Sequence, residues 1–181
     1  MAKVTNIHLW VPELFCSKGG IQVFSSFLMQ AIHSLYPHVK LSILLKNDSL
    51  IVSQIVEQDD DRFLNIQTYC SGKVKPPLRT IFFGLRLLSL AIAQKPSLVI
   101  MTHLNFAPIA LILQKLIGTK YIAIAHGVEA WDIQNPLLKR SLQSADLILA
   151  VSNFTRDRLC QEQNLLADQV RILHNTFDAQ A

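Results

Sequence analysis

The sequence predicts an α/β fold built on a doubly wound, parallel, Rossmann-like sheet. Apolar runs of strand length alternate along the chain with stretches in which apolar residues recur at helical spacing. The strand-length runs are apolar throughout, which is typical of strands whose two sheet faces are both covered by helices. The chain has 181 residues, of which 50% are hydrophobic and 17% charged. That length suits one compact core, so we expect one Rossmann-like domain over residues 1–173.

The first third of the chain predicts a βαβ unit. Residues 7–11 and residues 41–45 are apolar runs of strand length. Between them, apolar side chains recur at the spacing of one helix face, namely Ile21, Phe24, Leu28, Ile32 and Leu35. A short strand is expected over residues 63–68, after an acidic turn at residues 59–61 that we interpret as solvated surface.

The remainder of the chain predicts a helix and then three strand–helix units. Pro76 and Pro77 open a helix over residues 78–94, since proline is tolerated in a first helical turn. A final strand over residues 170–173 precedes residues 174–181, which we expect to begin an interdomain hinge. The three units pair strands with helices as follows: 98–101 with 107–116, 121–125 with 136–142, and 147–151 with 154–163.

The composition excludes several classes of protein. Half of the residues are hydrophobic, so the chain is not disordered, and the sparse glycine and proline exclude a fibrous protein. Cys16, Cys70 and Cys160 are far apart and form no C-x-x-C pair, so neither a disulfide framework nor a zinc module is indicated. The chain start lacks the pattern of a signal peptide. These features favour a reducing cytoplasm, and the net charge of +4 is a modest bias toward anionic ligands.

A glycine-containing loop follows the first predicted strand. Lys18, Gly19 and Gly20 immediately precede the first helix, where glycine permits close approach and unpaired N–H groups attract a phosphate or a sugar hydroxyl. A tight entry turn without a ligand explains the same pattern equally well. The loop is neither the G-x-G-x-x-G fingerprint nor a P-loop, which weakens the dehydrogenase and nucleoside triphosphatase readings.

Two histidines follow adjacent predicted strands. His103 and His126 lie at equivalent ends of the fourth and fifth strands, where an open parallel sheet binds its ligands. Either histidine alone would usually be structural, whereas the pair in register favours a site. Glu129 and Asp132 follow His126, yet their spacing matches no standard ligand set, so no metal is expected. Ser152 is placed to cap the helix after the sixth strand, whether or not it also meets a ligand.

With these landmarks in order, the chain resembles the N-terminal half of the retaining family-4 (group 1) glycosyltransferases, which have the two-domain GT-B architecture. The resemblance spans almost the whole chain, although only Asn175 and Asp178 keep the usual hinge pattern. Its landmarks are Gly19-Gly20-Ile21, His103, His126-Gly127 with Glu129 and Trp131, residues 145–152, and Phe154-Thr155.

The resemblance implies a reaction and a set of site residues. Such enzymes transfer a sugar from a nucleotide-diphosphate sugar to an acceptor hydroxyl with retention, the leaving phosphate itself taking the acceptor proton, and need neither metal nor cofactor. The donor-binding Glu-x7-Glu half is not in this sequence, so we expect this chain to be inactive alone. His126 is expected to act in catalysis, and the expected substrate-binding residues are Lys18, Gly19, Gly20, His103, Glu129 and Ser152.

Other interpretations stay open at this stage. The chain could be a non-catalytic sugar- or phosphate-binding module, a truncated remnant, or an unrelated Rossmann-like protein. The expected partners are the nucleotide-sugar donor, the hydroxyl acceptor and the missing C-terminal domain, with no nucleic acid. The helix over residues 78–94 either packs on the core with a solvated rim or lies on the inner membrane surface as a peripheral contact. The second alternative rests on basic residues that flank its apolar side chains, namely Lys73, Lys75, Arg79 and Arg86.

Overall fold

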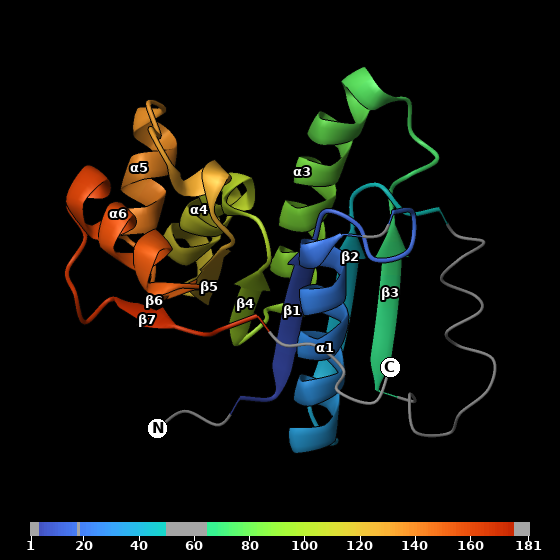
Figure 1. Ribbon diagram of the computed structural model, residues 1–181. Helices are drawn as coiled ribbons and strands as arrows, with labels where there is room; N and C mark the ends of the chain where they lie inside the picture. The colour runs from blue at the N-terminus through green and yellow to red at the C-terminus, as the bar shows by residue number, and fades with distance from the viewer. Residues whose placement is uncertain (1–3, 18, 50–64, 176–181) are drawn as a thin grey trace.

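The computed structural model of the chain describes residues 4–17, 19–49 and 65–175 (Figure 1). In that part of the chain, seven parallel strands form one sheet in the order β3-β2-β1-β4-β5-β6-β7. The strands are β1 (Asn6–Val11), β2 (Lys40–Leu45), β3 (Ile66–Cys70), β4 (Leu98–Met101), β5 (Lys120–Ala125), β6 (Leu147–Ala150) and β7 (Val170–Ile172). The Rossmann-like α/β class predicted from the sequence is confirmed.

Five α-helices and two short 3-10 helices connect the described strands. They are α1 (Gly20–Leu35), α3 (Pro76–Gln94), η2 (Leu104–Phe106), α4 (Ala107–Ile117), η3 (Val128–Ala130), α5 (Pro136–Gln143) and α6 (Asn153–Gln163). Each expected helix is present, and its bounds differ from the expectation by at most two residues. Helix α3 begins at Pro76 itself, because the missing N–H of a proline would be unpaired in a first turn anyway. The edge strand β3 starts and ends later than residues 63–68, whose first two members lie outside the described residues.

The helices divide into two layers (Figure 1). Helix α1 packs on one sheet face, where Phe24 and Ile32 share a core cluster with Leu9 and Ile43. Helices α3 to α6 pack on the opposite face. Their core-facing side chains include Phe83 and Leu87 of α3, Leu113 of α4, Leu142 of α5 and Leu159 of α6.

The coverage of the sheet differs in one respect from the expectation. Fully apolar strands predict helices on both faces, yet no described helix covers β5 and β6 on the α1 side. Ile122 and Leu149 on that side are half-buried, whereas Ile148 on the other side is fully buried. Ile124 of β5 is nevertheless fully buried on the α1 side, so the lack of a described helix leaves only part of β5 and β6 half-buried there.

Helix α3 is apolar on the side that faces away from the core as well. It is long and apolar enough to span a membrane by length and composition alone, and 17% of its apolar window is buried. Leu78, Ile81 and Leu85 are each more than 60% exposed, so the rim of this helix is not the solvated polar surface expected of an ordinary core helix.

Candidate functional site

The candidate site lies where the carboxyl ends of β4 and β5 meet the start of α1. In β4–β5 pairing, Met101 lies opposite Ala123, so the two segments that follow these strands emerge side by side. Phe24, one turn into α1, packs edge-on against the His126 ring with 5.0 Å between ring centroids. The sheet thus brings His103, His126 and the first turn of α1 to the edge at which such sheets bind ligands.

His103 is held by the main chain of η2. Its Nδ1 accepts a hydrogen bond from the Asn105 N–H at 3.2 Å, so the neutral ring carries its proton on Nε2. Burial lowers the pKa of His103, the charge of Lys46 lowers it further, and the carboxylate of Glu129 opposes both. At neutral pH the ring is therefore an uncharged donor through Nε2–H, a group suited to a sugar hydroxyl or a phosphate oxygen.

His126 is more enclosed than a freely accessible ligand-binding histidine. Its Nε2 is buried and has no hydrogen-bond partner among the described residues. Burial lowers the pKa of the His126 ring and neighbouring His103 lowers it further, while Glu129 and a hydrogen bond with the Thr102 main chain raise it. A buried imidazole nitrogen without a partner is costly, so it requires a structural or functional reason.

The negative charge of Glu129 raises the pKa of both His103 and His126. Its Oε1 accepts a hydrogen bond from the His126 N–H at 2.5 Å, and its charge acts on both imidazole rings. Gly127 lies between them at φ 149° and ψ −107°, in the left-handed half of backbone space that glycine alone adopts readily. A Cβ atom at Gly127 would meet nothing within 4 Å, so this position is also open to approach.

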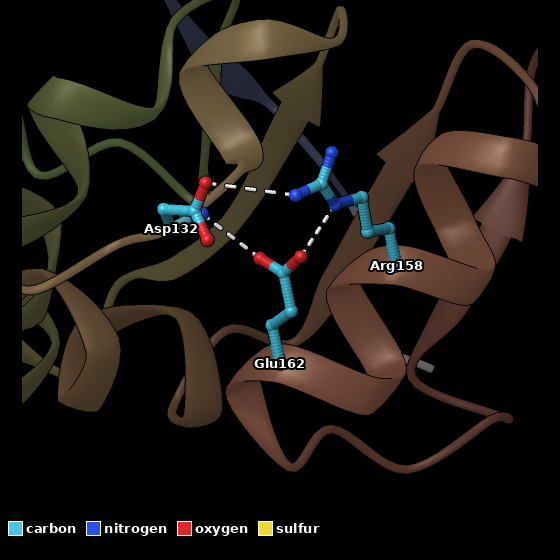
Figure 2. Close-up of polar contacts among 3 residues, drawn as sticks. All are labelled: Asp132, Arg158 and Glu162. Atoms are coloured by element: carbon cyan, nitrogen blue, oxygen red, sulfur yellow. Dashed lines mark hydrogen bonds and ion pairs between the residues drawn. The ribbon is translucent and has the colours of Figure 1, made fainter.

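The segment after Glu129 is anchored to α6 (Figure 2). The Asp132 N–H donates to Glu162 Oε2 at 2.8 Å, and the Arg158 guanidinium bonds to Glu162 and lies 3.5 Å from the Asp132 carboxylate. The same guanidinium stacks over the Trp131 ring at 4.7 Å. These contacts fix the loop that carries His126 and Glu129. Trp131 and Asp132 stood out in the sequence because they follow His126 closely, whereas nothing in the sequence pointed to Arg158 and Glu162.

The loop between β1 and α1 is organised by a residue that the sequence analysis missed. Asp48 is fully buried, and its carboxylate accepts from the N–H groups of Leu14, Phe15 and Cys16 at 2.7 to 3.0 Å. These N–H groups are therefore occupied by a protein carboxylate and do not face a ligand. The signal in the sequence is an acidic residue three positions after the second predicted strand.

The start of α1 is open at Gly20, whereas at Gly19 the Gln22 side chain lies close, with Oε1 2.6 Å from the place of a Cβ. Gly19 is the N-cap of α1 without a side-chain hydrogen bond, and a Cβ at Gly20 would meet nothing within 4 Å. The unpaired N–H groups and positive end of the helix dipole can therefore face an anion. Lys18 lies outside the described residues.

Ser152 is a capping residue. Its Oγ accepts from the Thr155 N–H at 3.1 Å and lies 3.0 Å from Thr155 Oγ1, as expected for the start of α6. Ser152 follows β6, whose Ala150 pairs with Ala125 of β5, and among the described residues its hydroxyl bonds to Thr155 and to neither histidine.

A groove of about 300 Å³ opens near His103, between α3, η2, α4 and the start of α5. His103 borders it through Phe106, with 6.1 Å between the ring centroids. No group of three His, Cys, Asp or Glu side chains in the described residues could hold a metal ion.

Comparisons with known proteins relate the chain to glycosyltransferases. The family model described as Glycosyltransferase Family 4 matches residues 50–181. No curated protein matches the chain significantly in sequence.

Solved structures share the fold at low sequence identity. The structure of Anabaena Alr3699/HepE in complex with UDP-glucose aligns at a TM-score of 0.64 and 12% identity, over 95% of this chain and 44% of that one. The lipopolysaccharide outer core galactosyltransferase WaaB aligns at 0.63 and 13%, over 96% and 46%. UDP-N-acetylglucosamine 2-epimerase from Rickettsia bellii aligns at 0.64 and 10%, over 96% and 45%. The chain spans less than half the length of these structures, and its fold matches one half of the GT-B architecture.

Proposed function

This chain belongs to glycosyltransferase family 4, and we propose from that premise that it forms the acceptor-side domain of an enzyme that transfers a sugar from a nucleotide-diphosphate sugar to an acceptor hydroxyl with retention. The observation that carries the proposal is the convergence of His103, His126 and Glu129 beside the open start of α1. The donor diphosphate would be held chiefly by a second domain that the 181 residues do not include.

The donor would meet two features of this chain. The uncapped first turn of α1, with Gly19 and Gly20, offers N–H groups and a positive dipole to a phosphate oxygen. His126 would contact the donor sugar through Nε2, which has no hydrogen-bond partner among the described residues. This contact would need the imidazole ring to move slightly away from the Phe24 ring. Glu129 would hold the His126 main chain in place.

The acceptor would approach from the side of His103. Its neutral ring, with the proton on Nε2, would orient the acceptor oxygen or a neighbouring hydroxyl. The acceptor oxygen forms a bond to the anomeric carbon as the bond from that carbon to the departing phosphate breaks on the same face. The acceptor proton passes to the departing phosphate oxygen, so the chain's contribution is positioning and electrostatic stabilisation.

The proposed reaction uses no metal or organic cofactor, and we propose that it takes place in the cytoplasm. Ser152 would line the cleft more loosely than His126. The alternative of a binding module without catalysis predicts binding of the nucleotide sugar but no transfer under any pairing with a second domain.

The test is a fusion of residues 1–181 to the donor-binding half of a family member. We expect sugar transfer by the fused enzyme, with the anomeric configuration of the donor retained in the product by nuclear magnetic resonance. We expect no turnover by the 181-residue chain alone, because the reaction needs both walls of the cleft. Turnover of a nucleotide sugar by the single chain, or an inverted product from the fused enzyme, would contradict the proposal.

A further inference from the structure

The groove beside His103 has the character of an apolar binding site. Phe83 and Phe106 are buried and form its floor, and Ile109 and Leu138 line its walls. Its volume of about 300 Å³ lies at the lower end of the range typical of small-molecule sites, which are mainly apolar with a few placed polar groups.

Helix α3 leaves room for this groove through a glycine. Gly84 lies in the middle of the helix, where glycine costs roughly 1 kcal/mol relative to alanine. A Cβ there would lie 3.3 Å from Ile109 Cδ1, tighter than an ordinary contact, so any larger side chain would fill the space between α3 and α4. Gly84 therefore keeps the groove open at some cost to the helix.

The polar end of the groove lies next to the candidate site. Lys46 at the end of β2 and Asn105 of η2 line it, and the charge of Lys46 acts on His103. Phe106 lines the groove and also lies next to the His103 ring. A molecule in this groove would thus place a polar group at His103 and an apolar group between α3 and α4.

The apolar surface continues from the groove onto the outer side of α3. Ile81 lies one turn before Gly84 and is 64% exposed, and Leu78 and Leu85 extend the same surface. Arg79 bonds to Val74, Gly72 and Asn47, and Arg86 bonds to Cys70, so both guanidinium groups are directed to main-chain and amide oxygens, whereas Lys73 and Lys75 are exposed. Contact of this helix with an anionic membrane stays a prediction, and the groove itself is suited to an apolar chain.

We propose that the acceptor is an amphiphile, in which a hydroxylated head group is joined to an apolar chain that lies in the groove between α3 and α4. The inference rests on the proposed function, because that function supplies an acceptor whose hydroxyl must lie near His103. The head group would meet Lys46, Asn105 and His103, and the apolar chain would cover Phe106 and Ile109.

The test uses the 181-residue chain and a photoreactive decyl β-maltoside, with a diazirine in its alkyl chain, below its critical micelle concentration. Adducts are mapped by mass spectrometry, and decyl maltoside or maltose is added as competitor. We expect adducts on α3 and α4 at the groove, removed by decyl maltoside but not by maltose. Thr80→Trp, which places a large side chain in the groove, should reduce labelling at least about tenfold, which corresponds to about 1.4 kcal/mol.

Two control variants separate the groove from the outer face of α3. Ser89→Trp adds the same side chain at an exposed position of the same helix, away from the groove, and should leave labelling unchanged. Leu85→Gln replaces an exposed apolar side chain on the outer face of α3 and should also leave the labelling of the groove unchanged. Labelling that Thr80→Trp does not reduce, or that Leu85→Gln abolishes, would overturn the proposal in favour of a general apolar or membrane-binding face.

The outcome can be separated from that of the proposed function. Labelling needs only binding, whereas the fused enzyme reports sugar transfer. A labelled groove together with a fused enzyme that transfers no sugar would contradict the proposed function alone. Transfer to maltose that equals transfer to decyl maltoside, unaffected by Thr80→Trp, would overturn the amphiphilic acceptor and leave the transferase function in place.

Discussion

At the scale of single residues, the site depends on two neutral imidazoles and on one buried carboxylate. Burial is the main cause of the lowered pKa of His103 and of His126, so both rings stay uncharged at neutral pH. Asp48 remains a hydrogen-bond acceptor for three main-chain N–H groups of the loop before α1. Under the proposed function the histidines would contact the substrates, whereas Asp48 holds the loop before α1 through its main-chain contacts.

His126→Ala should reduce turnover by the fused enzyme on the order of a hundredfold, the range for loss of one positioned polar group. The substitution removes the hydrogen bond of the His126 ring with the Thr102 main chain and its edge contact with Phe24, so the melting temperature should fall modestly while the chain stays folded. His38→Ala, at an exposed histidine remote from the site, is the matched control and should retain full activity. An unfolded His126→Ala chain, or one with unchanged activity, would assign His126 to structure.

Cys16 is exposed, yet its thiol should react slowly with iodoacetamide below about pH 10. The hydrogen bond with Asp48 is the largest of several effects that raise the pKa of Cys16 to about 11, and only the thiolate reacts. Asp48→Asn should shift the pH midpoint of alkylation downward. Peptide mapping would follow Cys16 and Cys160 separately, and an unchanged Cys16 midpoint in Asp48→Asn would show that the carboxylate does not control the thiol.

At the scale of elements, the strand and helix order was predictable because the signals were local. Proline at the start of α3, the cap at Ser152 and the fully apolar runs each act within a few residues. The contacts that organise the site connect distant segments. Asp48 reaches residues 14–16, and Glu162 reaches Asp132, so no periodicity or short spacing reports them.

The positions of the site residues show the same limit. The pairing of β4 and β5 follows from the strand order of a Rossmann-like sheet, so the closeness of His103 and His126 could be predicted. The burial of His126 Nε2 depends on Phe24 and on side-chain packing around it, which the sequence does not specify. The groove beside α3 was missed because it needs Gly84 and Ile109 to face each other across two helices.

The turn after β5 should be the least tolerant of substitution among the glycine positions of the site. Gly127→Ala places a Cβ at φ 149° and should cost on the order of 1–3 kcal/mol of unfolding free energy in urea titrations. Gly20→Ala is the control, since its Cβ would enter open space at the start of α1, and should change the stability by less than about 0.5 kcal/mol. Equal stability of the two variants would mean that the turn relaxes without strain.

At the scale of the whole molecule, a buried polar network couples the sheet to the end of α3. His8 is fully buried in β1, and its Nε2 lies 2.7 Å from Gln94 Oε1. Gln94 also accepts from Ser42 of β2 and donates to Tyr69 of β3. One helix residue thus connects to three adjacent strands.

Burial lowers the pKa of His8 to about 4 from 6.5. The folded chain therefore binds the His8 proton less tightly than the unfolded chain does. The contribution of neutral His8 to the free energy of unfolding is fully present above pH 6.5 and decreases as the pH falls toward 4. One such proton contributes a slope of up to about 1.4 kcal/mol per pH unit. Urea unfolding of wild-type and His8→Gln chains across this window should show a shallower slope for the variant. Parallel slopes would exclude His8 as the source of the acid sensitivity.

The place of β1 between β2 and β4 also sets an order of events during synthesis. β1 pairs with β2, about 30 residues later, and with β4, which begins at Leu98. At about 5–20 residues per second, a ribosome needs roughly 4 to 17 s to pass from the end of β1 to the start of β4. During that interval the edge of β1 that later pairs with β4 is open, and from the end of β3 at Cys70 until α3 is complete at Gln94 the β1–β3 half also exposes the apolar face that α3 covers. A chaperone that holds the emerging chain during those seconds would protect the step at which this protein is most prone to aggregate.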